Sequence, residues 1–201
     1  MLRVALTGNL GMGKTTVLRL FEKLGAVTVD TDDVVRSLLR EKHVLEKIKS
    51  LLGSDVFSEN GGLDREKVAK MIFANHQKKR SLEDIIHPLV FEEIDSFLGK
   101  IKGRKKIIII EIPLLFERSY ENRFDRKITV FTDPDRALVR LEAKGMRREN
   151  GLLRLGSQLP VEEKIKRSDF VIDNNGSLAD ARVQVEKIYG KLLEEAENAD
   201  N

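Results

Sequence analysis

The sequence predicts an α/β fold in which helices cover a doubly wound, five-stranded parallel sheet. Short segments rich in β-branched residues alternate with segments whose apolar residues recur at helical spacing. The strongest strand segment, Lys105–Ile112, contains four consecutive isoleucines, as expected of a strand buried on both faces. The chain has 201 residues, 41% of them hydrophobic, which suits one domain with at most one insert.

A glycine-rich loop separates the first predicted strand from the first helix. Leu2–Thr7 has β-type composition and leads into Gly8, whereas apolar residues after Gly13 follow helical spacing. A glycine then ends the helix, and Ala26–Val29 forms a second strand. This strand–helix–strand unit is complete within about 30 residues, as a parallel sheet requires.

Only helices and turns are expected between the second and third strands. Apolar periodicity predicts helices at Val34–Arg40, Val44–Leu52, Arg65–Asn75 and Ser81–Gly99. Ser58–Gly62 predicts a turn, and His87-Pro88 predicts a break, because the residue before proline disfavours helical geometry. One helix is enough for a crossover, so we interpret residues 31–104 as a helical insert that binds a ligand.

The remaining elements continue the alternation of strands and helices. Further strands are expected at Ile128–Thr132 and Phe170–Ile172. Helices are expected from Asp133-Pro134 to about Ala143 and over Ser177–Glu195, with fraying over Glu194–Asn201. Between the last two strands, residues 141–167 form an arginine-rich helical stretch.

Composition excludes several classes of protein. The chain lacks cysteine, which rules out thiolate catalysis and cysteine-ligated metal centres. No apolar segment approaches the roughly 20 residues that span a bilayer, and the N-terminus does not resemble a secretion signal. We therefore expect a soluble, cytoplasmic protein without a membrane partner. The net charge of +3 is too small to indicate nucleic acid.

Residues Gly8–Thr15 match the phosphate-binding pattern G-x-x-x-x-G-K-[ST], after a strand and at the start of a helix. Backbone N–H groups from Gly11 to Thr15 would cradle phosphate oxygens, helped by the positive end of the helix. Lys14 would bridge phosphates, and the Thr15 hydroxyl would ligate Mg²⁺. The alternative is an ordinary glycine turn. The predicted nucleotide-binding residues are Gly11, Met12, Gly13, Lys14, Thr15 and Thr16.

Three carboxylates follow the second strand. A phosphoryl acceptor needs a carboxylate to orient its hydroxyl and accept the proton, and this end of a strand is a suitable place. Asp30 and Asp32 would share one face if the extended conformation persists, whereas Asp33 would lie opposite or begin a helix. The alternative is that these residues only cap that helix.

Arginines gather before the last strand. Arg136 and Arg140 share one helix face, and Arg147, Arg148 and Arg154 follow. Guanidinium groups bind phosphate oxygens and stabilise the charge of a transition state, so the stretch is a candidate lid. The alternative is a solvated amphipathic helix, since glutamates are interspersed.

The order of several motifs resembles the dephospho-coenzyme A kinases, a family of P-loop kinases, over nearly the whole chain. These motifs are GNLGMGKTT, DTD at Asp30–Asp32 followed by Arg36, GGLDR at Gly61–Arg65, IIHP at Ile85–Pro88, IPLLFE at Ile112–Glu117 and DFVIDNNG at Asp169–Gly176. The resemblance implies transfer of the ATP γ-phosphate to the ribose 3′-hydroxyl of dephospho-CoA. Asn9, Met12 and Thr15 depart from the commoner residues, but the backbone donors and a hydroxyl remain.

The resemblance also implies roles for individual residues. Asp32 is the catalytic base, acting with Lys14 and with Arg140, which reaches the transferring phosphates. Substrate contacts fall on Asp32, Arg36, Arg65, His87, Pro113 and Leu114. Arg147 belongs to a lid that extends to about Gln158, and Asn175-Gly176 lie beside the adenine. The expected ligands are ATP, Mg²⁺ and dephospho-CoA.

Two other functions stay open at this point. Another small-metabolite or nucleotide kinase would share the loop and differ in the insert. A nucleotide-dependent switch is weaker, because the D-x-x-G at Asp173–Gly176 follows the final strand and no Asn-Lys-x-Asp motif exists. The basic residues concentrate between Arg136 and Arg167, which favours a lid over ATP phosphates rather than a nucleic-acid surface. The sequence does not predict the oligomeric state.

Overall fold

The computed structural model describes residues 1–58, 61–101 and 106–198, apart from the side chains of Arg65 and Phe73. Its internal contacts group into two compact units. The sheet unit comprises Met1–Asp30 and Gly103–Asn201, and the helical unit comprises Thr31–Lys102.

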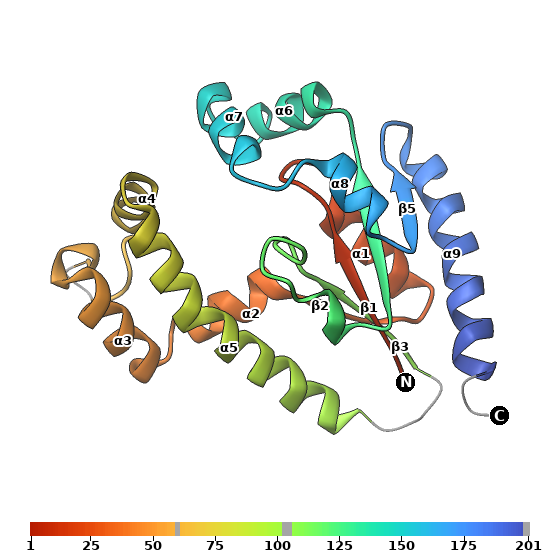
Figure 1. Ribbon diagram of the computed structural model, residues 1–201, viewed down its shortest axis with the longest axis horizontal. Helices are drawn as coiled ribbons and strands as arrows, with labels where there is room; N and C mark the ends of the chain where they lie inside the picture. Colours follow the sequence, from red (N-terminus) through yellow and green to blue (C-terminus); the bar gives the residue numbers. More distant parts are fainter. Residues whose placement is uncertain (59–60, 102–105, 199–201) are drawn as a thin grey trace. The chain divides into compact units, whose positions relative to one another are not determined.

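The sheet unit is built on five parallel strands in the order β2-β3-β1-β4-β5 (Figure 1). The strands are β1 (Leu2–Thr7), β2 (Val27–Asp30), β3 (Ile107–Glu111), β4 (Arg126–Phe131) and β5 (Phe170–Asp173). In register, Glu111 of β3 lies beside Leu6 of β1 on one side and beside Asp30 of β2 on the other. The carboxyl ends of the central strands therefore meet at one edge, where the loop after β1 begins. The predicted α/β fold is confirmed.

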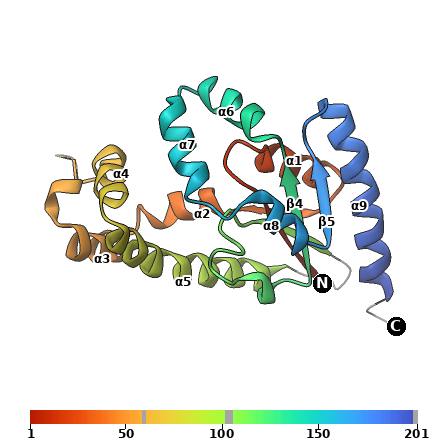
Figure 2. The same cartoon turned by 45° about the horizontal axis from the view of Figure 1, so that its top comes forward.

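Helices pack on both faces of this sheet. The sheet unit contains α1 (Lys14–Lys23), α6 (Pro134–Glu142), α7 (Arg148–Gly156), α8 (Val161–Lys166), α9 (Leu178–Asn198) and the 3₁₀ turn η2 (Glu121–Arg123). Val130 belongs to the buried cluster that α1 and α9 share, whereas Phe131 packs with Ile165 of α8. Successive strand residues point to opposite faces, so α8 covers the face opposite α1 and α9 (Figure 2).

The helical unit is organised around its longest helix. It contains α2 (Thr31–Leu38), α3 (Lys42–Leu52), the 3₁₀ turn η1 (Ser54–Val56), α4 (Arg65–Ala74) and α5 (His76–Lys100). Helices α2, α3 and α4 each contact α5. On α3 the buried residues Val44, Ile48 and Leu52 recur every fourth position, which places them on one helix face.

The predicted break at His87-Pro88 is wrong, because α5 continues through Pro88. A proline inside a helix costs about 3 kcal/mol. The helix buries Ile86, Val90, Ile94 and Leu98 at a spacing of four residues. Burial of each such side chain contributes about 1.5–3 kcal/mol, so tertiary packing outweighs the local penalty.

The chain ends and turns differ from the prediction in smaller ways. Helix α9 extends to Asn198 instead of fraying from Glu194, because Leu192 and Ala196 are buried. Lys105 and residues 59–60, which fall in a predicted strand and a predicted turn, lie outside the described residues. Within the described ranges, no helix is both long and apolar enough to cross a membrane.

Candidate active site

The loop between β1 and α1 is shaped by glycines that have no space for a side chain. Gly13 has a φ of 90°, and a Cβ there would lie 2.2 Å from Nδ2 of Asn174. At Gly11, with a φ of 79°, a Cβ would lie 2.7 Å from the carbonyl oxygen of Ala137. The loop is thus packed directly against two neighbouring segments, and its own backbone lines the site.

Met12 faces the protein interior. Its side chain is buried, and its Sδ accepts a hydrogen bond from the Asn9 N–H at 3.3 Å. Its carbonyl oxygen accepts from Nδ2 of Asn174 at 2.8 Å. Any contact of Met12 with a nucleotide therefore falls to its backbone.

Charged and hydroxyl groups meet at the start of α1. The Lys14 Nζ lies 3.8 Å from Oε1 of Glu111 and donates to the carbonyl oxygen of Asn9 at 3.3 Å. The Thr15 hydroxyl donates to Oε2 of Glu111 at 3.2 Å. Lys14 and Glu111 are both buried, whereas Thr15 and the next residue, Thr16, are exposed. The end of β3 thus supplies a buried carboxylate to the phosphate-binding loop.

The oxygen atoms of Thr15 and Glu111 fit a hard divalent cation. Mg²⁺ prefers oxygen ligands, keeps several waters and commonly takes the remaining ligands from substrate phosphates. No group of three or more His, Cys, Asp or Glu side chains able to hold a metal occurs in the described part of the chain. A cation here would therefore depend on a bound nucleotide for much of its coordination.

Arg140 lies beside the same loop. Its Nη1 donates to the Thr132 hydroxyl at 3.2 Å, and its Nη2 donates to the Asn174 carbonyl oxygen at 2.8 Å. A Cβ placed on Gly13 would be 3.5 Å from Nη1 of Arg140. The carboxyl ends of β4 and β5 thus hold this guanidinium next to the loop.

The Asn175-Gly176 segment is held by its own hydrogen bonds. Oδ1 of Asn175 accepts from the Asp133 N–H at 2.9 Å, and its Nδ2 donates to Asp173 Oδ1 at 2.8 Å. At Gly176 a Cβ would lie 2.6 Å from Oδ2 of Asp180. The Asn175 side chain therefore joins two loops, and the absence of a side chain at Gly176 permits a tight turn.

The other predicted residues of the sheet unit are placed as follows. Arg147 is the exposed N-cap residue of α7. Pro113 and Leu114 are half-buried after β3, and the Pro113 carbonyl oxygen accepts from Nζ of Lys164 at 3.1 Å. These residues share the sheet unit with the phosphate-binding loop.

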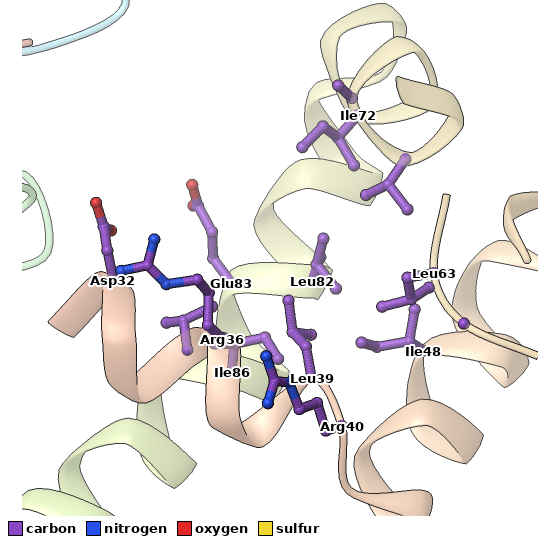
Figure 3. Close-up of a pocket in the computed structure, with 14 residues that line it drawn as sticks. Asp32, Arg36, Leu39, Arg40, Ile48, Leu63, Ile72, Leu82, Glu83 and Ile86 are labelled. Carbon is purple, nitrogen blue, oxygen red and sulfur yellow. The ribbon is translucent and has the colours of Figure 1, made fainter. Parts of the chain in front are cut away.

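A cavity of about 630 Å³ lies within the helical unit. In Figure 3, the polar residues Asp32, Arg36 and Glu83 gather at one end, whereas Ile48, Leu63 and Ile72 lie at the other. Among the residues that the structure describes, the lining consists of Asp32, Val35, Arg36, Leu39, Arg40, Ile48, Gly62, Leu63, Val68, Ala69, Ile72, Leu82, Glu83 and Ile86. The cavity thus combines apolar walls with a charged end.

The three aspartates after β2 do not share an extended segment. The strand ends at Asp30, and Asp32 and Asp33 fall in the first turn of α2. Negative side chains are favourable at this end of a helix. Asp33 forms an ion pair with Arg36, while Asp32 lines the cavity. The structure therefore separates the two neighbours: Asp32 and Arg36 belong to the cavity lining and Asp33 does not.

His87 does not join this set in the structure. The cavity is lined by Glu83 and Ile86 of α5, but His87 is not among its lining residues. Burial lowers the pKa of His87, and the negative charge of Asp84 partly opposes this shift. Arg65 begins α4, and its side chain lies outside the described residues.

The sequence did not single out the apolar residues of the cavity, nor the polar residues Arg40 and Glu83 at the cavity and Thr132 and Asn174 beside the loop. Asn174 lies inside the motif DFVIDNNG at Asp169–Gly176, so the sequence did indicate that this position belongs to a site. Arg40 and Glu83 carried no such signal, because charged residues are common on helices. Only the folded helical unit, in which α2 packs against α5 and Arg40 follows α2, shows that they line one cavity.

Comparison with known proteins identifies relatives of this chain. The profile of the dephospho-CoA kinase family matches residues 2–180. The dephospho-CoA kinase of Aquifex aeolicus is 36% identical over 193 residues, covering 96% of this chain and 98% of the relative. A solved structure from Thermus thermophilus has a TM-score of 0.83 at 31% identity, covering 95% of this chain and 97% of its own. Dephospho-CoA kinase from Campylobacter jejuni has a TM-score of 0.69 at 27% identity, covering 96% and 98%.

Proposed function

Because the chain belongs to the dephospho-CoA kinase family, we propose that its sheet unit binds ATP and that its helical unit binds dephospho-CoA. The chain is an ATP-dependent kinase of coenzyme A biosynthesis. The main support for assigning one ligand to each unit is the difference between the side chains of the two sites. Cationic Lys14 and Arg140 gather at the phosphate-binding loop, whereas the cavity that contains Asp32 has apolar walls.

On the nucleotide side, we assign the phosphates to the loop backbone and to two cations. Backbone N–H groups at a helix start form a natural anion site, and Lys14 adds a full positive charge next to it. Arg140 is already fixed by Thr132 and Asn174, so it needs little ordering to meet charge that develops on the transferring phosphoryl group. The Asn175-Gly176 turn is assigned to the adenine.

Mg²⁺ is proposed as the accompanying ion. Thr15 and Glu111 would hold it, directly or through water. When bound, Mg²⁺ neutralises phosphate charge. Glu111 also has a role that does not depend on the ion, because its carboxylate balances the positive charge of Lys14.

On the acceptor side, the cavity supplies both kinds of surface that dephospho-CoA requires. The apolar residues suit uncharged parts of the molecule, and the guanidinium groups of Arg36 and Arg40 suit its diphosphate. Asp32 lies at the charged end of the cavity (Figure 3). We therefore assign Asp32 to the hydroxyl that reacts. Arg65 and His87 remain predictions from family resemblance.

The proposed step is an in-line transfer. The 3′-hydroxyl oxygen forms a bond to the γ-phosphorus as the bond to the β–γ bridging oxygen breaks. Asp32 accepts the proton of the hydroxyl, and ADP departs with the bridging oxygen. Lys14 and Arg140 stabilise charge on the oxygens involved.

The arginine-rich segment is proposed to act as a lid over the phosphates. Helix α7 carries Arg148 and Arg154, and Arg147 precedes it. In the structure, Nη1 of Arg148 lies 3.3 Å from Oε2 of Glu142, and its Nη2 lies 3.6 Å from Oδ1 of Asp135. These exposed ion pairs are weak, so exchange of carboxylates for phosphates is energetically accessible.

The test is a competition between acceptors. The protein is offered ATP with dephospho-CoA, adenosine, shikimate, gluconate or nucleoside monophosphates, and ADP and phosphorylated product are measured. We expect one coenzyme A per ADP and much slower turnover with the other acceptors. Brisk phosphorylation of another acceptor without formation of coenzyme A would refute the assignment.

A further inference from the structure

The connector between α7 and α8 is hydrogen-bonded to the first half of the phosphate-binding loop. We call this connector, Gln158–Pro160, the strap. Oε1 of Gln158 accepts a hydrogen bond from the Leu10 N–H at 2.9 Å. In return, Nδ2 of Asn9 donates to the Leu159 carbonyl oxygen at 3.0 Å. The two bonds run in opposite directions and join the strap to consecutive loop residues.

The strap is anchored on its other side by a buried ion pair. Oε1 of Glu117 accepts from the Leu159 N–H at 3.1 Å and from Nζ of Lys164 at 2.7 Å. Lys164 is fully buried, and its Nζ also donates to the Pro113 carbonyl oxygen at 3.1 Å. Burial lowers the pKa of Lys164, and its hydrogen bond to Glu117 opposes that shift. A charge-assisted contact of this kind fixes its partners firmly.

Asn9 connects the strap to Lys14. Its side chain is bonded to Leu159, while its carbonyl oxygen accepts from Nζ of Lys14 at 3.3 Å. The same oxygen accepts from the Met12 N–H at 3.3 Å. Asn9 is buried, so its peptide group has little freedom once these bonds form. The position of the Lys14 ammonium group thus depends on residues about 150 positions further along the chain.

We propose that the strap positions Lys14 for ATP, with Gln158 and Asn9 as its positioning residues. The proposal rests on the assignment of Lys14 to the ATP phosphates made above. A lysine side chain has four rotatable bonds, and holding its ammonium group in place before ATP arrives lowers the ordering cost of binding. The strap begins two residues after the end of α7, so the proposed lid is connected at its C-terminal end to a segment that Glu117 anchors.

Two variants remove the strap contacts without altering Lys14. Gln158→Met keeps a side chain of similar length but removes the acceptor for Leu10. Asn9→Ala removes the donor to Leu159 but keeps the backbone carbonyl oxygen that faces Lys14. Loss of one such hydrogen bond corresponds to about a fivefold to tenfold change in equilibrium. We expect each variant to weaken ATP binding about tenfold, with KM for dephospho-CoA within about twofold of the parent.

A double-mutant cycle separates positioning from general support of the fold. ATP affinity is measured by calorimetry on the full chain for Gln158→Met, Lys14→Met and the double variant. If the strap acts through Lys14, Gln158→Met changes affinity less than about twofold once Lys14 is replaced. A merely structural contact would give the same tenfold loss in both backgrounds, and this result would overturn the proposal.

Controls distinguish failure of this inference from failure of the proposed function. Ser50→Ala, on α3 of the helical unit, removes only an exposed hydrogen bond to the Glu46 carbonyl oxygen and should leave ATP affinity unchanged. Unchanged affinity in both Gln158→Met and Asn9→Ala, with a loss in Lys14→Met, overturns the strap proposal alone. Unchanged affinity in Lys14→Met overturns the assignment of Lys14, and with it the premise of the strap.

Discussion

The two sites of this protein are built in opposite ways. The phosphate-binding loop takes most of its groups from consecutive residues, and its shape depends on glycines and backbone hydrogen bonds. The cavity of the helical unit draws its lining from α2, α3, α4 and α5 and from residues 39–40 and 62–63, and most of that lining is apolar. Lys14 and Glu111 of the first site are buried, whereas Asp32 and Arg36 of the second are exposed.

This difference matches the ligand that we propose for each site. Phosphate groups are small, charged and alike in all nucleotides, so one preorganised loop with fixed donors suits them. An acceptor must be distinguished from other alcohols, which requires contacts from several directions. Variants of the loop are therefore expected to affect ATP and the rate, and variants of the cavity to affect the acceptor.

Lys14→Met should have the largest effect. Removal of the cation at the transferring phosphates should lower kcat/KM for ATP by about 10³-fold, while KM for dephospho-CoA changes less than twofold. Steady-state kinetics with each substrate varied in turn would check this. Lys23→Met, at the exposed end of the same helix, serves as the control. If Lys14→Met impaired the use of dephospho-CoA as strongly as the use of ATP, the proposed division between the two sites would be wrong.

Asp32→Asn tests the base. The amide keeps the size of the side chain but cannot accept the proton, so kcat should fall about 10²-fold while ATP affinity is retained. Asp33→Asn, its neighbour outside the cavity lining, should stay within about threefold. Turnover should be measured alongside calorimetric ATP binding. Near-normal turnover of Asp32→Asn would show that Asp32 is not the catalytic base and would leave Asp30 and Asp33 as candidates.

Glu111→Gln tests the buried carboxylate beside Thr15. Loss of its charge should raise the Mg²⁺ concentration needed for half-maximal rate by about tenfold, because a neutral amide oxygen is a weaker ligand. Titration of activity with MgCl₂ at saturating ATP would measure this. Asp30→Asn, the register neighbour on β2, is the matched control. An unchanged Mg²⁺ requirement would exclude Glu111 from supporting the ion.

Leu82→Ala tests the apolar wall of the cavity. Loss of this contact should raise KM for dephospho-CoA about fivefold and leave KM for ATP unchanged. Phe97→Ala, at an exposed position of the same helix, controls for changes in α5. If KM for ATP rises in parallel, the cavity does not serve the acceptor alone.

The smallest expected effect concerns His87 and pH. Burial holds the folded-state pKa below its ordinary value of 6.5, so the unfolded chain takes up the proton first on acidification. The stability that neutral His87 supports is therefore complete above pH 6.5 and is lost as pH falls through the folded-state pKa. His87→Gln should reduce the fall in Tm between pH 7 and pH 5 by about 2 °C. Thermal melts at both pH values would measure it. His76→Gln is the control, and an identical fall in the parent and His87→Gln would contradict the assignment.

The features that sequence predicted well are local ones. The strand Leu2–Thr7, the glycine loop and the helix after it follow from composition and periodicity over a few residues. The isoleucine strand was recognised because all five residues of β3 are buried, so that its pattern is uniform. Local rules suffice where the site itself is local.

The features that sequence did not predict depend on packing between distant segments. Pro88 follows the local rule for a helix break, yet the burial of five residues along α5 outweighs the cost of the proline. The strap joins Gln158 to Leu10, and no pattern in either segment indicates the other. From the sequence, Glu83 cannot be distinguished from any other charged helix residue. Its place in the cavity follows only from the packing of α5 against α2. The cytoplasmic location and the absence of a nucleic-acid partner remain predictions.

Separate measurement of the two ligand affinities tests the division between the sites most directly. Calorimetry of ATP and of dephospho-CoA binding is compared for Lys14→Met and Leu82→Ala. The division predicts that Lys14→Met weakens only ATP and that Leu82→Ala weakens only dephospho-CoA, each by at least about fivefold. If either variant weakens both ligands equally, the assignment of one ligand to each unit is wrong.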